Sequence, residues 1–139
     1  QDFRNMLTRQ HGVNLPKQGA HYADPQAYRD GFLAFLRFAK KNLGGQTAVK
    51  VDPHWATQSA VLQGFAQAQA PDVVLREDRL AEGLAWLCDE VGATPAPLPS
   101  VREPAPVPLA AIWDEELEVA CRDAYGRDYI AFGYGDYAA

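Results

Sequence analysis

Apolar side chains recur every three to four residues after Asp24-Pro25, and this spacing predicts the clearest helix of the chain. Asp24 can accept hydrogen bonds from the unpaired amides of the first turn, and Pro25 fits the first helical position because no N–H is needed there. Gly44-Gly45 is expected to end the helix. The apolar stripe, which we expect to form core, consists of Tyr28, Phe32, Phe35, Leu36, Ala39 and Leu43.

Two further stretches show the same helical period. One is expected to begin with Asp78 as its cap and to close at Gly92, with Leu80, Leu84, Leu87 and Val91 on its apolar face. The last helix is predicted from about Leu109 to Tyr125 and is expected to stop at Gly126. The aromatic residues that follow are predicted to fold back on the core.

Two short segments are predicted to be extended, at 48–51 and 72–75. The second is a compact apolar run opened by a Pro-Asp turn, which is typical of a buried strand. Because it leads directly into a helix, it indicates the strand–helix step of an α/β fold.

The whole chain is interpreted as one domain or part of one. Residues 1–24 are expected to be an irregular and helical lead-in, with the helix and the strand–helix step over 25–92. Residues 93–108 carry six prolines within 95–108 and are predicted to be an extended connector. A helix and an aromatic tail are expected over 109–139.

The formal charge is uneven, with a net +5 over residues 1–50 and a net −10 over 51–139. The basic part could face an anionic ligand, or it could be ordinary solvated charge. No basic run with interleaved aromatics occurs, which disfavours binding to DNA or RNA. Neither a membrane-spanning run nor a signal peptide is visible, so we expect a cytoplasmic protein.

The cysteines and histidines show no metal-ligand spacing, so no metal site is expected. Cys88 and Cys121 each lie on the apolar face of a predicted helix. Two small buried hydrophobic residues are the main interpretation, and a disulfide between the two helices stays open. Phosphate-binding glycine loops and serine nucleophile motifs are absent from the sequence.

His54 is the histidine in the most suggestive setting. It follows Asp52-Pro53, where the proline favours extended geometry, and precedes Trp55, a large apolar anchor. An imidazole can accept a proton from a sugar hydroxyl near neutral pH. The alternative is a structural histidine beside a packed tryptophan.

Arg76 and Arg79 follow the second extended segment, at the end where α/β folds place ligands. With Glu77 and Asp78 they could line a ligand site. A surface cluster of ion pairs is the alternative interpretation.

The order of these motifs resembles the carboxy-terminal half of the carbohydrate sulfotransferases, the family of the chondroitin and dermatan enzymes and their bacterial relatives. The resemblance rests on Asp52-x-His54-Trp55-x-x-Gln58, on Arg76-Glu77-x-x-Leu80, on Val91-Gly92, and on Tyr125-x-x-Asp128-Tyr129-x-x-Phe132-Gly133-Tyr134. The family has a proline where this chain has Thr57, a change that its bacterial branch tolerates.

The resemblance implies the helix-rich carboxy-terminal part of a P-loop-like α/β fold with few short strands. It also implies transfer of a sulfuryl group from 3′-phosphoadenosine 5′-phosphosulfate to a hydroxyl of a carbohydrate or similar acceptor. The family's donor-binding segments have no match here. By resemblance, His54 is the candidate catalytic residue, and Trp55, Arg76 and Arg79 are candidate acceptor-binding residues. A non-catalytic helical interaction module on the same scaffold is the alternative function.

Overall fold

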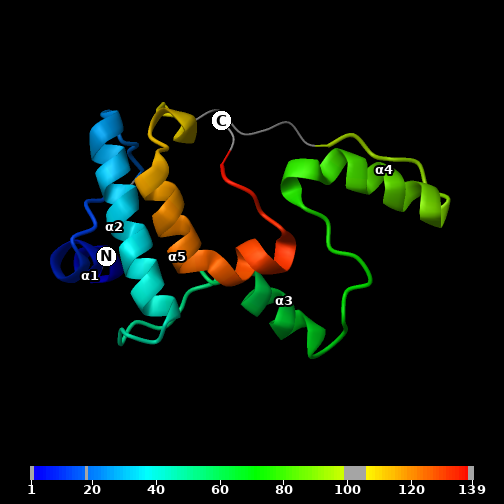
Figure 1. Ribbon diagram of the computed structural model, residues 1–139, viewed down its shortest axis with the longest axis horizontal. Helices are drawn as coiled ribbons and strands as arrows, with labels where there is room; N and C mark the ends of the chain where they lie inside the picture. Colours follow the sequence, from blue (N-terminus) through cyan, green and yellow to red (C-terminus); the bar gives the residue numbers. More distant parts are fainter. Residues whose placement is uncertain (1, 18, 99–105, 138–139) are drawn as a thin grey trace. The chain divides into compact units, whose positions relative to one another are not determined.

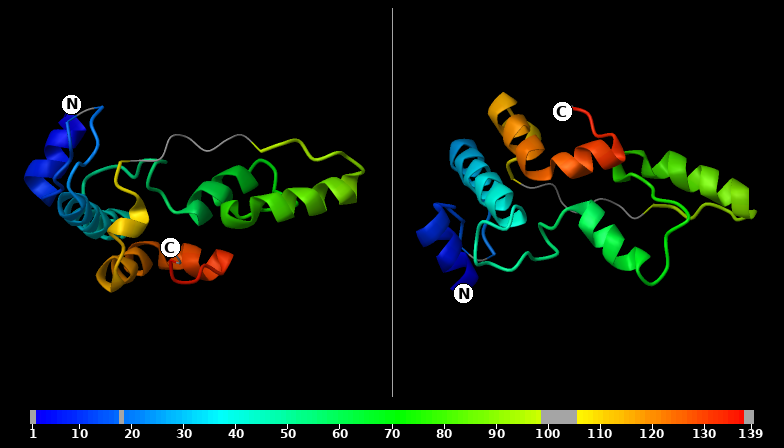
Figure 2. Two further views of the ribbon diagram at one scale, coloured as in Figure 1. Left: turned by 90° about the horizontal axis from the view of Figure 1, so that it is seen from above. Right: turned by 60° about the horizontal axis from the view of Figure 1, so that its bottom comes forward.

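A computed structural model of the protein describes residues 2–17, 19–98 and 106–137. Five α-helices and two short 3₁₀ helices occur within these ranges (Figures 1 and 2). Their bounds are α1 Asp2–His11, α2 Pro25–Leu43, α3 Gln58–Ala66, η1 Glu77–Arg79, α4 Leu80–Val91, η2 Leu109–Ala111 and α5 Glu115–Phe132.

The chain divides into two compact units. The first holds the described residues up to Val61 together with those from 106 onward, and the second holds the described residues from Leu62 to 98. None of the described helices is long and apolar enough to cross a lipid bilayer.

Helix α2 is the central element of the first unit, and its predicted bounds are confirmed. The Asp24 carboxylate accepts hydrogen bonds from the amides of Gln26 at 3.3 Å and Ala27 at 3.0 Å. These are two of the four amides that a helix start leaves without a partner. At the other end Gly45 has a φ of +71°, a conformation that favours glycine and stops the helix.

Two apolar clusters pack against opposite sides of α2, which runs beside α5 in both figures. The cluster toward α5 contains the buried residues Leu33, Leu36, Val107, Ile112 and Leu117. The cluster toward α1 contains the buried residues Leu7, Val13 and Phe38, with Phe35 and Trp55 partly buried against them. Of the stripe predicted for α2, Leu36 and Ala39 are buried and its aromatic residues are only partly buried. The buried Leu33 and Phe38 were not part of the prediction.

Helix α5 differs from the helix predicted over 109–125. It begins at Glu115, where the Asp114 side chain accepts a hydrogen bond from the Leu117 amide at 3.0 Å, and it continues past Gly126 to Phe132. The backbone only kinks at Tyr125 (φ −119°, ψ 23°). A glycine ends a helix when it adopts the left-handed conformation, and here Gly133 does so, with a φ of +65°.

The two predicted strands do not form within the described part of the chain. A strand is stabilised by hydrogen bonds to a neighbouring strand, and neither segment has such a neighbour. In the segment 48–51 the Val49 carbonyl instead accepts a hydrogen bond from the Asn42 side chain at 2.7 Å. The helix-rich character of the predicted fold is thus confirmed, whereas its strands at 48–51 and 72–75 are corrected.

Arg29, Arg37 and Lys40 on α2 pair with acidic side chains on or just before α5. Arg29 on α2 pairs with Asp114 at 2.6 Å and with Glu116 at 2.7 Å. The hydrogen bond from Arg29, followed by that from the Leu117 amide, lowers the pKa of Asp114 below its usual range. Basic side chains of α2 therefore face acidic side chains of α5, which favours the interpretation that they are ordinary solvated charge.

Gly31 lies where α2 contacts the loop that precedes it. A methyl group at this position would lie 2.5 Å from the Tyr22 hydroxyl oxygen and 2.8 Å from the Asn14 carbonyl oxygen. Gly31→Ala is therefore expected to lower the free energy of unfolding by about 1–3 kcal/mol, measured by urea denaturation.

The matched control is Gly126→Ala in α5, where nothing lies within 4 Å of the added methyl. Alanine favours a helix interior over glycine, so this variant should be stabilised by about 0.5–1 kcal/mol. Equal effects of the two substitutions would contradict the close approach at Gly31.

In the second unit, helix α4 ends as predicted at Gly92, which has a φ of +68°. Its start differs from the prediction, because the 3₁₀ turn η1 precedes it and Arg79 occupies the position before its first residue. The Asp78 carboxylate accepts two hydrogen bonds from Arg76, at 2.9 and 2.6 Å, and is not the predicted cap. The connector predicted over 93–108 lies partly outside the described residues, at 99–105.

Candidate functional site

His54 lies in a tight turn that Asp52 organises. The Asp52 carboxylate oxygen Oδ1 accepts a hydrogen bond from the His54 amide at 3.0 Å and lies 2.5 Å from the ring nitrogen Nδ1. The amide and ring contacts of His54, in that order, lower the pKa of Asp52 below its usual range. The imidazole is 91% exposed. With the Nδ1 proton directed at Asp52, Nε2 is the nitrogen that can accept a proton.

Trp55 is held in the core by both its ring and its indole N–H. The N–H donates to the Asn42 side-chain oxygen at 2.8 Å, and the ring meets Phe35 and Phe38 edge-on at centroid distances of 6.3 and 6.0 Å. These contacts favour the interpretation that Trp55 is a structural anchor for the turn. The sequence-based role of Trp55 in acceptor binding stays a prediction.

The turn is joined to the far end of α5 by Asp128, a carboxylate only 4% exposed. It accepts hydrogen bonds from the Gln58 amide at 2.7 Å, from the Ser59 amide at 3.0 Å and from the Ser59 hydroxyl at 2.7 Å. Asp128 therefore caps the start of α3 from a different helix. An acidic group at this end of a helix is also favoured by the helix dipole.

Two tyrosines complete this junction. The Tyr125 hydroxyl donates to the Trp55 carbonyl at 3.1 Å, and the Tyr134 hydroxyl donates to the Gln58 side-chain oxygen at 2.9 Å. Burial, with smaller contributions from Cys121 and Asp128, raises the pKa of Tyr125 to about 12, so its phenol keeps its proton. We call residues 52–59 and 125–134, joined in this way, the turn–tail junction.

The carboxylate of Glu118, in the first turn of α5, holds the aromatic tail. It accepts hydrogen bonds from the Trp113 indole at 3.1 Å, the Tyr129 hydroxyl at 3.1 Å and the Tyr137 amide at 3.0 Å. The Tyr137 ring lies 4.6 Å from that of Trp113. The prediction that the tail folds back on the core is confirmed.

Both cysteines are free thiols, and both are half-buried rather than buried as the main interpretation expected. Burial, and next the charge of Glu118, raises the pKa of Cys121 to about 11. Because the thiolate is the reactive form, Cys121 should be labelled slowly by a thiol reagent at neutral pH in the native protein.

The test is a Cys88→Ala variant, in which Cys121 is the single thiol. Labelling is expected to speed up by at least about tenfold in urea, where burial no longer raises the pKa. Equal labelling rates of Cys121 in the native and in the denatured protein would contradict its buried setting. The labelling of a small thiol with and without urea corrects for the effect of urea on the reagent.

Arg76 and Arg79 belong to the second unit, whereas His54 and Trp55 belong to the first. Arg76 binds Asp78 through two parallel hydrogen bonds, which lower the pKa of that carboxyl. Arg79 donates to Glu82 at 3.1 and 2.7 Å. This geometry favours the surface ion-pair interpretation, and acceptor binding by the two arginines stays a prediction.

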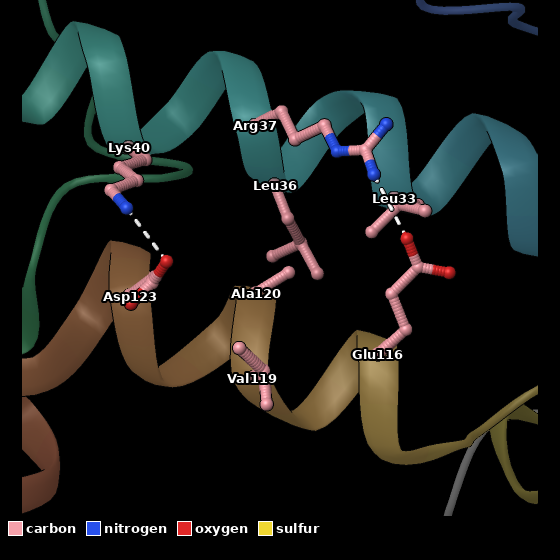
Figure 3. Close-up of a pocket in the computed structure, with 8 residues that line it drawn as sticks. All are labelled: Leu33, Leu36, Arg37, Lys40, Glu116, Val119, Ala120 and Asp123. Carbon is pink, nitrogen blue, oxygen red and sulfur yellow. Dashed lines mark hydrogen bonds and ion pairs between the residues drawn. The ribbon is translucent and has the colours of Figure 1, made fainter.

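A groove of about 360 Å³ lies between α2 and α5 in the first unit (Figure 3). Its floor is apolar, and an ion pair crosses it toward each end, Arg37–Glu116 at 2.9 Å and Lys40–Asp123 at 2.6 Å. The lining residues are Leu33, Leu36, Arg37, Lys40, Glu116, Val119, Ala120 and Asp123. Sequence patterns did not indicate this groove, because it depends on how the two helices pack.

No family model, no curated protein and no solved structure matches the chain. Within the described ranges, no group of three or more His, Cys, Asp or Glu side chains is placed to hold a metal ion. The turn–tail junction, in which residues distant in the sequence are hydrogen-bonded to each other, is the candidate site.

Proposed function

We propose that this chain is the acceptor-side part of a sulfotransferase that transfers a sulfuryl group to a hydroxyl of a carbohydrate or similar acceptor. One observation carries the proposal. The two most extended motifs of the resemblance, at 52–58 and 125–134, are about seventy residues apart in the sequence and are hydrogen-bonded to each other through Asp128, Tyr125 and Tyr134. Motifs that share one function are expected to meet in the fold.

The exposed imidazole of His54 suits the role of general base. The acceptor hydroxyl would attack the sulfur of the phosphosulfate and form a new S–O bond, while its proton passes to Nε2 of His54. The bond between sulfur and the phosphate oxygen breaks, and adenosine 3′,5′-bisphosphate leaves. Asp52 would orient the ring and stabilise the imidazolium that forms.

The positive groups that sulfuryl transfer needs around the donor are assigned to no residue of this chain. By analogy with phosphoryl transfer, they must neutralise charge on the transferring oxygens. We propose that a donor-binding part of the same polypeptide, outside the 139 residues, supplies them.

The direct test is calorimetric titration of the complete polypeptide that contains these residues with adenosine 3′,5′-bisphosphate. Saturable binding is expected, together with sulfate transfer from labelled donor to a panel of oligosaccharides. The 139-residue chain alone should not bind the bisphosphate. A complete polypeptide that binds neither donor nor spent donor would overturn the proposal.

His54→Ala is expected to reduce the turnover of the complete enzyme by about a hundredfold or more, as removal of a general base does. Because the side chain is almost fully exposed, the free energy of unfolding should change by no more than about 0.5 kcal/mol. Turnover and urea denaturation measured on the same preparation separate the two effects.

His21→Ala, at an exposed loop position, is the matched control and should leave turnover unchanged. A parallel loss of stability and turnover in His54→Ala would show that this histidine has a structural role.

A helical interaction module is the second candidate function, and the groove between α2 and α5 favours it. Val119 on its rim is 54% exposed, next to the apolar floor formed by Leu33 and Leu36. An intact cellular polypeptide of 15.3 kDa that binds no bisphosphate would favour this function over the enzyme.

A further inference from the structure

Three polar side chains are buried among the described residues, namely Asn42, Glu118 and Asp128. Glu118 holds the aromatic tail and Asp128 caps α3. Asn42 is the least exposed of the three, at 2%, and lies in the last turn of α2. Because burying an amide costs free energy unless it is hydrogen-bonded, the contacts of Asn42 show what its burial achieves.

The side-chain amide of Asn42 holds two separate parts of the loop that follows α2. Its nitrogen Nδ2 donates to the Thr47 hydroxyl at 2.8 Å and to the Val49 carbonyl at 2.7 Å. Its oxygen Oδ1 accepts a hydrogen bond from the Trp55 indole at 2.8 Å. A carbonyl can only accept and an indole N–H can only donate, so this orientation of the amide is the one that satisfies both.

The hydrogen bond between Asn42 and Trp55 is linked to His54 through the backbone of one turn. The Asp52 carbonyl accepts hydrogen bonds from the amides of Trp55 at 3.1 Å and Ala56 at 2.9 Å. The Asp52 carboxylate in turn binds the His54 amide and contacts the ring nitrogen Nδ1. Consecutive contacts therefore join a buried amide of α2 to an exposed imidazole.

The contact between Asp52 and Nδ1 decides which nitrogen of the His54 ring carries the proton. A carboxylate can only accept, so it selects the Nδ1–H tautomer and leaves Nε2 as the nitrogen that accepts a proton. Because the imidazole is exposed and not packed in the core, its orientation depends on how firmly the turn is held.

We propose that Asn42 is a positioning residue for His54. By binding Trp55 it keeps the turn 52–56 in place, the His54 ring in the Nδ1–H form and Nε2 available for the proton of the acceptor. This inference rests on the proposed function, in which Nε2 is the general base. Asn42 acts through Trp55 and the turn, since it is itself buried.

Asn42→Ala is expected to lower the kcat of the complete enzyme by about tenfold to a hundredfold with little change in KM, because a misplaced base slows the chemical step and not acceptor binding. Trp55→Phe removes the same hydrogen bond from its other end and keeps an aromatic ring, so it should lower kcat similarly. The double variant should lose no more than the larger single loss, since both substitutions remove one interaction. Losses that multiply would contradict the inference.

Thr47→Val is the matched control. It removes a different hydrogen bond of the same amide, keeps the β-branch and leaves the bond to Trp55 intact. This variant should keep the kcat of the wild type, whatever its effect on stability. A kcat loss in Thr47→Val equal to that in Asn42→Ala would show a general effect of loosening the loop and would overturn the inference.

Nuclear magnetic resonance of the ring nitrogens reads the tautomer of His54 in the 139-residue chain, without any activity. At alkaline pH, where imidazoles are neutral, proton–nitrogen correlation spectra should show the Nδ1–H form in the wild type and in Thr47→Val. Asn42→Ala and Trp55→Phe should show a mixture with the Nε2–H form. An unchanged tautomer in either variant, when folded, would overturn the inference, and Trp55→Phe decides if Asn42→Ala does not fold.

The tautomer and the turnover separate this inference from the proposed function. A complete polypeptide that binds no bisphosphate and transfers no sulfate would overturn the proposed function, whereas a changed tautomer in Asn42→Ala would still support the positioning of His54 by Asn42. Sulfate transfer that Asn42→Ala and Trp55→Phe leave at the wild-type kcat would overturn the inference and leave the sulfotransferase proposal intact.

Discussion

Asp128→Ala is expected to lower the free energy of unfolding of the first unit by about 2–4 kcal/mol. The carboxylate is buried and accepts three hydrogen bonds from Gln58 and Ser59. Removing it leaves two backbone amides and a hydroxyl at the start of α3 without the buried carboxylate that they bind. Urea denaturation followed by circular dichroism measures the loss.

Asp128→Ala is also expected to change hydrogen exchange at the start of α3, which tests the turn–tail junction directly. Because Asp128 caps α3, the amides of Gln58 and Ser59 should exchange faster in Asp128→Ala while those of α2 stay protected. A loss of protection confined to α5 would contradict a cap that acts across helices.

Asp123→Ala is the matched control, since Asp123 lies on the same helix and pairs with Lys40 at the surface. An exposed ion pair contributes little, so its removal should change the free energy of unfolding by less than about 1 kcal/mol. If Asp128→Ala were no more destabilising than Asp123→Ala, the turn–tail junction would not be a stabilising element.

Phe38→Ala is expected to have the largest effect, a loss of about 3–5 kcal/mol in the free energy of unfolding. Phe38 is 2% exposed, and its ring lies against those of His11, Phe35 and Trp55 at centroid distances of 4.7, 6.2 and 6.0 Å. Truncation removes buried apolar area and leaves a cavity in the cluster that joins α1 to α2.

The cavity left by Phe38→Ala is also expected to change the surroundings of Trp55, which anchors the turn that carries His54. Near-ultraviolet circular dichroism should show a changed tryptophan environment in Phe38→Ala. Phe65→Ala is the control, because Phe65 is 69% exposed in α3 and its removal should cost no more than about 0.5 kcal/mol. Similar losses in the two variants would contradict the position of Phe38 in the core.

Local patterns determined where most helices lie. The Asp-Pro start and the Gly-Gly end of α2 are set by neighbouring residues alone, through side-chain capping and left-handed glycine. The apolar spacing of α2 also identified Leu36 and Ala39 as core positions, because a helix places residues three and four apart on one face. It missed the buried Leu33 and Phe38.

Local patterns did not predict the structure correctly where contacts between distant residues determine it. Gly126 was expected to end α5, but the helix continues through it until Gly133 adopts a left-handed φ. The segments 48–51 and 72–75 have the composition of strands, and composition cannot provide the neighbour that a strand requires.

For the candidate site, the sequence by itself determined the motif residues and the turn around His54, since Asp52 acts on a residue only two positions away. Only the tertiary structure decided that Asp128 caps α3, that Tyr125 and Tyr134 reach the turn, and that Trp55 faces the core through Asn42. These contacts join residues up to 76 positions apart, and no local preference specifies such pairs. They form because burying the α2 and α5 faces brings those side chains within hydrogen-bonding distance.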